Sequence, residues 1–226
     1  MKDNYQIAID GPSATGKSTI AKKLASSLNF IYIDTGAMYR SIALYCIENN
    51  VDIDNKEVIE PILKNIEIDI KYIDGVQHIY LNNRDVSEAI RENKVSQAAS
   101  KVSVHEPVRN KLVNLQQELA SKSNVIMDGR DIGTVVLPNA TLKIYLTASS
   151  SERAKRRMLE LQEKGTMITL EEVLKDLEER DYRDTHREIG PLKKADDAIE
   201  VDTTNMNIEE VLNTIRDLFN KKVGIE

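Results

Sequence analysis

The stretch Gly11-Pro12-Ser13-Ala14-Thr15-Gly16-Lys17-Ser18-Thr19 matches the pattern G-x-x-x-x-G-K-[ST] at every fixed position. A short strand-like segment, Tyr5 to Asp10, precedes it, and apolar residues at helical spacing follow it from Ile20 to Leu28. A strand, a glycine-bounded loop and a helix N-terminus are what phosphate binding requires, because the loop N–H groups can then point at one anion. We therefore predict that this stretch binds a nucleoside triphosphate, with Lys17 at the β- and γ-phosphates and the Ser18 hydroxyl on Mg²⁺.

Composition limits the remaining function classes. The chain has 226 residues, of which 41% are hydrophobic and 30% charged, so it can form one sizeable domain with an insertion. Its net charge of −6 disfavours general binding to nucleic acid or to anionic membranes, so positive charge at a nucleotide site must be gathered locally. The single cysteine, Cys46, lies among apolar residues and indicates a packed side chain in a reducing compartment. We expect a cytosolic protein without a membrane span or secretory signal.

Further apolar segments predict a doubly wound parallel α/β sheet of five strands. Together with the phosphate loop, this pattern resembles the P-loop NTPase fold, for which we expect the strand order 2-3-1-4-5. After Tyr5–Asp10, strands are expected at Phe30–Asp34, Val125–Asp128, Leu142–Leu146 and Ala198–Asp202. Helices are expected at about 37–49, 56–64, 94–102, 104–121, 149–165, 169–187 and 208–221. Because ligands bind at the carboxyl ends of such strands, the residues that follow each strand are the first candidates for a site.

One segment departs from this alternation of strands and helices. Ile66 to Tyr72 alternates apolar and polar residues, Asp74-Gly75 is a hairpin turn signal, and Val76 to Leu81 supplies a return strand. We expect an antiparallel subdomain at about 62–93, inserted into a single kinase domain whose core is 1–61, 94–148 and 191–226. A helical lid at about 149–190 completes the domain.

Polar side chains follow two more of the predicted strands. Asp34-Thr35-Gly36 with Arg40 follows the second strand, and Asp128-Gly129-Arg130-Asp131 follows the third. Asp128 occupies the position from which a carboxylate meets Mg²⁺, directly or through water. The alternative for either Asp34 or Asp128 alone is that it caps a helix or turn, but the set together with a phosphate loop favours function.

The predicted lid carries a second signal. Arg180, Arg183, Asp184 and Arg187 share one helix face, and such a face suits an anion lying over it. The alternative is a solvated face with the pairs Glu179–Arg183 and Arg180–Asp184, each worth about 0.3–0.5 kcal/mol. A neighbouring phosphate loop favours the lid interpretation, in which guanidinium groups close over phosphates and exclude water. The first lid helix adds Arg153, Arg156 and Arg157, whose acidic neighbours leave their role open.

An acceptor that is itself a phosphate needs no general base, because its oxygen is already anionic near pH 7. Mg²⁺, Lys17 and arginines must instead offset the repulsion between donor and acceptor. His78, His105 and His186 are scattered without triad-like companions, which disfavours a nucleophilic triad or a histidine metal site.

With these residues assembled, the chain resembles the cytidylate kinase family of nucleoside monophosphate kinases. The matching pieces are Asp10 to Thr19, Asp34 to Arg40, Ala98-Ala99-Ser100 with Arg109, Asp128 to Val136 and Glu179 to Arg187. The phosphate loop is widely shared, but D-G-R-D-x-G-T-V-V beside D-[ST]-G-x-x-Y-R is specific to this family. Thr35 stands where some relatives have serine, which keeps the hydroxyl group.

The resemblance implies transfer of the ATP γ-phosphoryl group to CMP or dCMP, with Mg²⁺ as cofactor. It implies that Lys17, Arg40, Arg130 and Arg187 are catalytic and that the last three hold the acceptor phosphate. It further implies that Thr35, Arg109 and Asp131 read the cytosine, that Ser100, Arg180 and Asp184 contact the sugar, and that Asp128 lies at the acceptor and the metal. We also place Arg157 beside ATP, and expect a monomer that needs neither nucleic acid nor a membrane.

Three alternatives stay open on the sequence. The acceptor could be UMP, AMP or shikimate. A GTP-binding switch would need an N-K-x-D motif, and Asn55-Lys56-Glu57-Val58 lacks the aspartate. A nucleic-acid-binding ATPase is disfavoured by the negative net charge.

Overall fold

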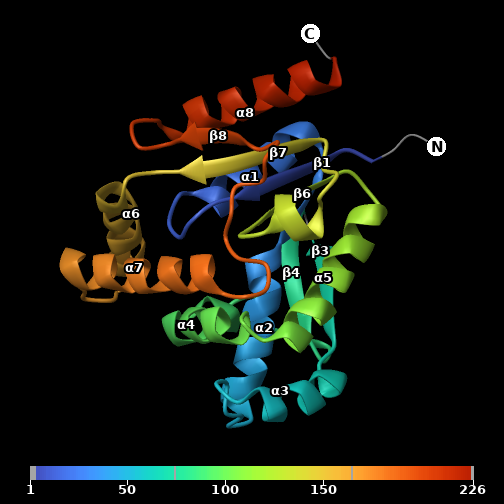
Figure 1. The fold of residues 1–226 in the computed structure, drawn as a ribbon, viewed down its shortest axis with the longest axis vertical. Coiled ribbons are helices and arrows are strands. Elements are labelled where there is room, and N and C mark those ends of the chain that lie inside the picture. Colours follow the sequence, from blue (N-terminus) through green and yellow to red (C-terminus); the bar gives the residue numbers. More distant parts are fainter. Residues whose placement is uncertain (1–3, 74, 164, 225–226) are drawn as a thin grey trace. The chain divides into compact units, whose positions relative to one another are not determined.

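The structure, a computed structural model, describes residues 4–73, 75–163 and 165–224. Its strands are β1 (Gln6–Asp10), β2 (Ile31–Asp34), β3 (Ile68–Ile73), β4 (Val76–Leu81), β5 (Arg84–Asp85), β6 (Val125–Gly129), β7 (Leu142–Thr147) and β8 (Ile199–Asp202) (Figure 1). Its α-helices are α1 (Lys17–Leu28), α2 (Thr35–Glu48), α3 (Lys56–Ile62), α4 (Asn93–Val102), α5 (Glu106–Ser121), α6 (Ser150–Glu163), α7 (Leu170–His186) and α8 (Ile208–Val223). Shorter helical turns are η1 (Leu63–Asn65), η2 (Ala89–Arg91) and η3 (Ile132–Val136).

The described residues form a five-stranded sheet in the order β2-β6-β1-β7-β8. Counted among themselves along the chain, these strands run 2-3-1-4-5, so the predicted order and fold class are confirmed. The central strand β1 pairs in parallel with β6 and with β7, and β7 pairs in parallel with β8. The register places Asp10 beside Gly129, so the residues that follow β1 and β6 emerge next to each other.

The predicted antiparallel hairpin is also present as a separate sheet. β3 and β4 pair from Ile68 with Leu81 to Ile73 with Val76, and β5 adds a short edge strand. Gly75 has φ of +76°, which suits the tight turn, while Asp74 of the predicted turn lies outside the described residues. The observed strands begin and end within two residues of the predicted ones. The small differences arise because alternating apolar residues show which side of a strand is buried but do not fix its first and last residues.

The chain divides into two compact units. The first comprises residues 1–32 and 122–226, and the second comprises residues 33–121. Each unit has buried apolar residues of its own, and each is treated by itself below. The phosphate loop, α6 and α7 all belong to the first unit, whereas the segments around Arg40 and Arg109 belong to the second.

In the first unit, α1 and α8 pack on the same face of the parallel sheet. Leu24 from α1 and Ile215 from α8 are fully buried against strand residues such as Ile7 and Ile144. The ring of Phe219 meets the rings of Tyr5 and Phe30 edge-on, each at 5.6 Å between centroids. This packing holds α1, and with it the end of the phosphate loop, rigidly on the sheet.

Helices α6 and α7 lie in the segment that the sequence predicts to be a lid, called the lid segment here, and they share a small apolar core of their own. Ala154 and Leu161 of α6 pack with Val173 and Leu177 of α7, and Ala14 of the phosphate loop packs against this cluster. Thr169 and Glu172 form a capping box at the start of α7. The lid segment thus contacts the phosphate loop through apolar as well as polar groups.

In the second unit, α2 packs with α4, α5 and β4. Met38, Ile42 and Cys46 on α2 are completely buried, which confirms the packed position predicted for Cys46, and burial raises the pKa of the Cys46 thiol to about 11. The helix starts two residues earlier than expected because the Asp34 side chain accepts a hydrogen bond from the Ala37 N–H and so caps it.

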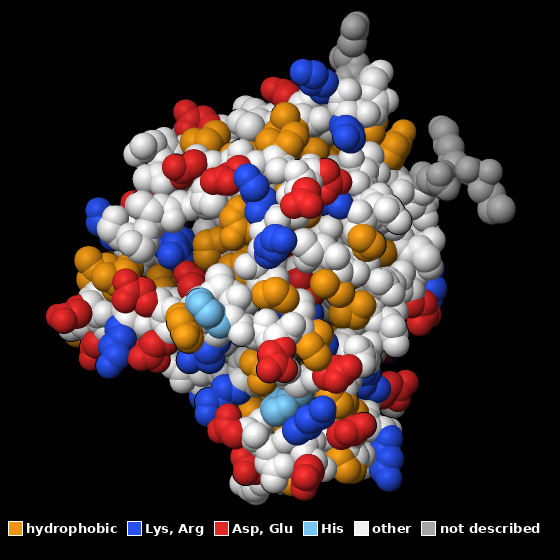
Figure 2. All heavy atoms as spheres, in the orientation of Figure 1, with side chains coloured by type: hydrophobic (Ala, Val, Ile, Leu, Met, Phe, Trp, Pro, Cys, Tyr) orange, Lys and Arg blue, Asp and Glu red, His pale blue; other side chains and the backbone are white. Residues whose placement is uncertain are grey.

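The surface shows no concentration of one charge in the view of Figure 2, where lysine and arginine side chains are interspersed with aspartate and glutamate. Within the described residues, none of the helices combines the length and the apolar character needed to cross a bilayer.

Candidate active site

The phosphate loop has the backbone conformation that its glycines predict. Gly11, Ala14 and Gly16 have φ values of +149°, +60° and +89°, and α1 begins at Lys17, immediately after the loop. A Cβ atom on Gly11 would lie 2.2 Å from the carbonyl oxygen of Leu146, so this position requires glycine. Ala14 is a non-glycine residue in the left-handed region, a strained conformation of the kind that concentrates at ligand-binding loops.

Lys17 is folded against its own loop. Its Nζ donates to the carbonyl oxygen of Pro12 at 2.5 Å and to Thr15 Oγ1 at 3.3 Å, and the side chain is only 5% exposed. Burial and the nearby Arg130 hold the pKa of Lys17 well below its usual value, although Asp128 acts in the opposite direction. An anion bound in the loop would therefore stabilise the charged form of Lys17.

The two predicted metal ligands lie in contact with each other. Ser18 Oγ donates to Asp128 Oδ2 at 2.7 Å, and the hydroxyl of Tyr32 donates to Asp128 Oδ1 at 2.8 Å. Asp128 is 6% exposed and lies in β6, as predicted. A hydroxyl and a carboxylate at this spacing are hard oxygen donors that fit one shared Mg²⁺ together with nucleotide phosphates.

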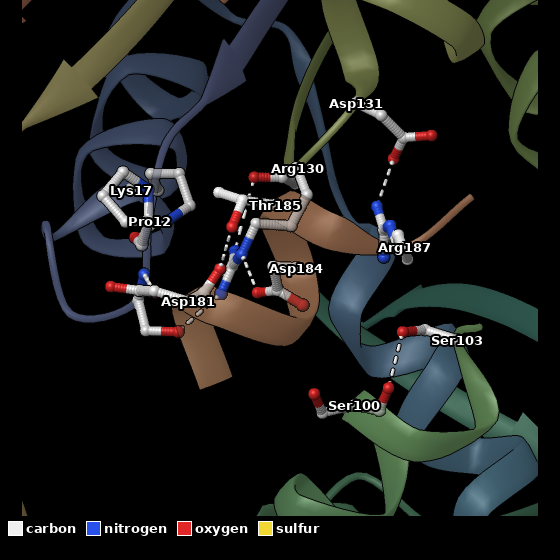
Figure 3. A network of polar contacts seen from close by, with 12 residues as sticks. Pro12, Lys17, Ser100, Ser103, Arg130, Asp131, Asp181, Asp184, Thr185 and Arg187 are labelled. Atoms are coloured by element: carbon white, nitrogen blue, oxygen red, sulfur yellow. Dashed lines mark hydrogen bonds and ion pairs between the residues drawn. The ribbon is translucent and has the colours of Figure 1, made fainter. Parts of the chain in front are cut away.

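Arg130 bridges the phosphate loop and the lid segment. Its Nε donates to Asp184 Oδ2 at 2.7 Å, and its Nη2 donates to Ser13 Oγ at 2.9 Å. Although burial opposes its charge, Asp184 raises the pKa of Arg130 above its usual value. Burial likewise opposes ionisation of Asp184, but Arg130 and Arg180 lower the pKa of Asp184. The side chain of Arg130 is thus fixed as a cation on two sides (Figure 3).

Ser13 is the point at which the lid segment meets the loop. Its N–H donates to Asp181 Oδ1 at 3.0 Å, its carbonyl oxygen accepts from Arg153 Nη1 at 3.0 Å, and its hydroxyl accepts from Arg130. Arg153 also forms an ion pair with Asp181. Sequence reasoning placed Ser13 in the loop but missed Asp181 as a contact. The signal was Asp181 itself, an acidic residue among the arginines of α7.

Arg187 and Asp131 are paired with each other. Arg187 Nη2 lies 3.4 Å from Asp131 Oδ1, and Arg187 Nε donates to the carbonyl oxygen of Gly190 at 2.6 Å (Figure 3). Both side chains are less than a tenth exposed. The structure therefore brings together two residues that sequence reasoning assigned to different parts of one acceptor.

The other lid arginines differ in their surroundings. Arg156 contacts Glu152 and donates to Thr203, and Arg157 pairs with Glu160 on the same helix. Arg180 lies close enough to Lys17 and to Asp184 to lower the pKa values of both. The three arginines of α6 that the sequence left ambiguous thus have distinct roles, and Arg153 is the one on the loop.

The second unit holds the remaining predicted site residues. Asp34 Oδ2 accepts from Arg40 Nη2 at 2.9 Å while its other oxygen caps α2, so the capping role considered for Asp34 is present along with a salt bridge. Arg109 is 1% exposed; its Nη1 donates to the carbonyl oxygen of Ser103 at 3.4 Å, and its Cζ lies 5.9 Å from the centre of the Tyr39 ring. Thr35 and Ser100 are 3% and 5% exposed.

Asp10 is a buried carboxylate that sequence reasoning did not include. It is 4% exposed and accepts hydrogen bonds from the N–H groups of Ile132 and Gly133. Burial, with a contribution from Asp131, raises the pKa of Asp10 to about 6, although the two N–H groups and Lys17 act in the opposite direction.

Comparison with known proteins shows which protein family this chain is similar to. A family model described as "Cytidylate kinase" matches residues 7–221. A protein of Lactobacillus johnsonii named "Cytidylate kinase" is 52% identical over 221 residues, which cover 97% of this chain and 96% of that protein. A protein of Fusobacterium nucleatum with the same name is 55% identical over 213 residues, which cover 94% and 96%.

Among solved structures, the chain is similar to an uncharacterised protein from Eubacterium ventriosum. The TM-score is 0.53 at 12% identity, over 97% of this chain and 99% of the other. At this identity the likeness concerns the fold alone.

The raised pKa of Asp10 predicts a pH-dependent stability. Between its ordinary pKa of 3.8 and its folded pKa of about 6, the native state keeps a proton that the unfolded state loses. The free energy of unfolding of the wild type, relative to Asp10→Asn, should therefore fall by about 2 kcal/mol between pH 4 and pH 7. The charged groups that act on Asp10 or respond to it, Asp131, Lys17 and Tyr145, are the same in both proteins. Urea unfolding at both pH values measures this difference, and a difference that is constant or grows with pH contradicts the assignment.

Proposed function

Because the chain belongs to the cytidylate kinase family, we propose that it transfers the γ-phosphoryl group of ATP to CMP or dCMP, giving ADP and CDP or dCDP. The observation that carries this proposal is the family match over residues 7–221, joined to a phosphate loop whose Ser13 contacts Asp181 and Arg153 of the lid segment and also Arg130. In this reaction an oxygen of the acceptor phosphate bonds to the γ-phosphorus while the bond to the β–γ bridging oxygen breaks.

The charge pattern around the loop supports a reaction between two polyanions. Lys17, Arg130 and Arg153 all contact loop atoms. Neither His nor Cys is needed, since a phosphate acceptor is already ionised and requires no general base. What it requires is cationic groups held in place before the reaction, because such groups stabilise the charge of the transferring phosphoryl group without reorganising. We assign Lys17 and Arg130 to this role, with Arg40 and Arg187 at the acceptor phosphate.

Mg²⁺ would be held by Ser18 and Asp128, directly or through water. The two side chains share a hydrogen bond of 2.7 Å, and both offer the oxygen atoms that Mg²⁺ prefers. When bound with ATP, the ion supplies neutralisation of phosphate charge. Tyr32 orients the carboxylate of Asp128 from the other oxygen and so keeps Oδ2 directed at Ser18.

Recognition of the acceptor is assigned residue by residue from the family resemblance. Asp131 can accept from the exocyclic amine of cytosine, and Arg109 can donate to the cytosine carbonyl and ring nitrogen. Both are almost completely buried, as groups that read a base edge should be. Thr35 would assist at the base, and Ser100, Arg180 and Asp184 at the sugar. We assign Arg157 to ATP, and the single buried Cys46 suits a reducing cytosol.

The acceptor preference tests the function directly. With MgATP and a panel of CMP, dCMP, UMP, AMP and shikimate, ADP release should be fastest with CMP or dCMP. In the same assay Lys17→Ala should lower kcat by about 10²–10³-fold, because one group that stabilises the transferring phosphate is removed. Lys194→Ala, which removes an exposed lysine paired with Glu200, is the control and should behave as wild type. A preference for another acceptor, or wild-type turnover by Lys17→Ala, would refute the proposal.

The base selectivity should depend on Asp131. Asp131→Asn keeps the size of the side chain but replaces one carboxylate oxygen with an amide donor, which faces the cytosine amine unfavourably. The ratio of kcat/KM for CMP over UMP should fall by about 10- to 100-fold. Asp217→Asn, at an exposed carboxylate on α8, should leave that ratio unchanged. An unchanged ratio in Asp131→Asn would mean that another group reads the base.

A further inference from the structure

Asp10 connects two parts of the chain that the proposed function assigns to different substrates. It is the last residue of β1 and is bonded directly to Gly11, the first residue of the phosphate loop. Its Oδ1 accepts from the Ile132 N–H at 2.8 Å, and its Oδ2 accepts from the Gly133 N–H at 2.7 Å, across 122 and 123 residues of chain. Both oxygens are therefore used by backbone donors of one segment.

That segment begins immediately after Arg130 and Asp131. Ile132–Val136 is wound as a π-helical turn, closed by the hydrogen bond from the Leu137 N–H to the Ile132 carbonyl oxygen at 2.6 Å. Turns of this kind are rare and concentrate at functional sites. The N–H groups of Ile132 and Gly133 lie in its first turn, where a helix cannot supply partners of its own. Asp10 supplies them instead.

The turn leaves little room for a side chain at position 133. A Cβ atom there would lie 3.1 Å from Lys143 Cδ and 3.4 Å from Asp10 Oδ2. The side chain of Lys143 packs on one side of Gly133 while its Nζ pairs with Asp197 at 2.8 Å. The segment after Asp131 thus lies between Asp10 and Lys143, and a Cβ atom at position 133 would require Lys143 or the turn to shift by a few tenths of an ångström.

Stability alone does not explain why the buried carboxylate of Asp10 holds this segment. Burial disfavours its ionised form, as the rise of its pKa to about 6 indicates, so above that pH the group reduces the stability of the fold. A neutral side chain could cap one N–H without that cost. The carboxylate instead offers a separate oxygen to each of the two adjacent N–H groups.

We propose that Asp10 is a positioning residue, which holds the backbone that carries Arg130 and Asp131 at a constant distance from the start of the phosphate loop. It acts through those two residues and so rests on the roles proposed for them. The side chain of Arg130 is fixed by Asp184 and Ser13, whereas Asp10 fixes the backbone that follows Asp131. Asp10 does not act as a base, because both of its oxygens already accept from backbone N–H groups.

The test is the kinetics of Asp10→Asn with MgATP and CMP at pH 7.5. The amide presents a donor to one of the two N–H groups, which loosens the turn without changing its size. We expect KM for CMP to rise or kcat to fall so that kcat/KM for CMP drops about 10- to 100-fold, as misplacement of binding groups predicts. KM for ATP should change less than twofold, and the midpoint of thermal unfolding should not fall. Asp202→Asn, at the exposed last residue of β8, is the matched control and should behave as wild type.

A double variant shows whether Asp10 acts through Arg130. If it does, adding Asp10→Asn to Arg130→Ala should lower kcat/KM for CMP much less than Asp10→Asn does alone. Gly133→Ala alters the same turn on the side that faces Lys143. This variant should also lower kcat/KM for CMP with little change in KM for ATP, and it provides a test even if Asp10→Asn folds poorly. Unchanged CMP kinetics in folded Asp10→Asn, equal losses for ATP and CMP, or full additivity would overturn the proposal. If the wild type does not phosphorylate CMP at all, the proposed function fails instead.

Discussion

Three charged side chains bind the three polar groups of one residue, Ser13, and the phosphate loop depends on this arrangement. Asp181 accepts a hydrogen bond from the N–H of Ser13, Arg153 donates to its carbonyl oxygen, and Arg130 donates to its hydroxyl. Cations close together repel one another, so a cluster of arginines around Lys17 is stable only with carboxylates between them. Asp181 and Asp184 provide that compensation before any nucleotide is bound. The site is therefore organised in advance for polyanions, which is the condition for electrostatic catalysis.

The parallel sheet makes this cluster possible by register. β1 and β6 are neighbours, with Asp10 beside Gly129, so the phosphate loop and the turn that carries Arg130 leave the sheet side by side. Two buried carboxylates then serve the two strand ends: Asp128 contacts Ser18 at the start of α1, and Asp10 contacts the turn after Asp131. The pairing of β1 with β6 thus brings together site residues that are more than a hundred positions apart in the sequence.

Glycine spacing and hydrophobic periodicity are local signals, and from them the sequence predicted the phosphate loop and the hairpin. The strand order expected for the fold class is present, and Ser18 and Asp128, each assigned to Mg²⁺, lie in contact. The sequence did not predict the partners of Arg153 and Asp181. Helix periodicity shows which face of its own helix a residue occupies, but not which residue of another segment it contacts. Sequence reasoning also missed Asp10 and the π-helical turn. A carboxylate at the end of a strand has the same local pattern whether it caps a turn, binds a metal or bridges to a segment more than a hundred residues away.

Hydrogen exchange of the ligand-free protein tests the central claim, that the lid carboxylates hold the loop before substrate arrives. Asp181→Ala removes the partner of the Ser13 N–H and of Arg153, so amides of the phosphate loop and of α7 should exchange about tenfold faster than in the wild type. Asp176→Ala, on the exposed face of the same helix, should not change them. Equal exchange in Asp181→Ala and the wild type would contradict the account.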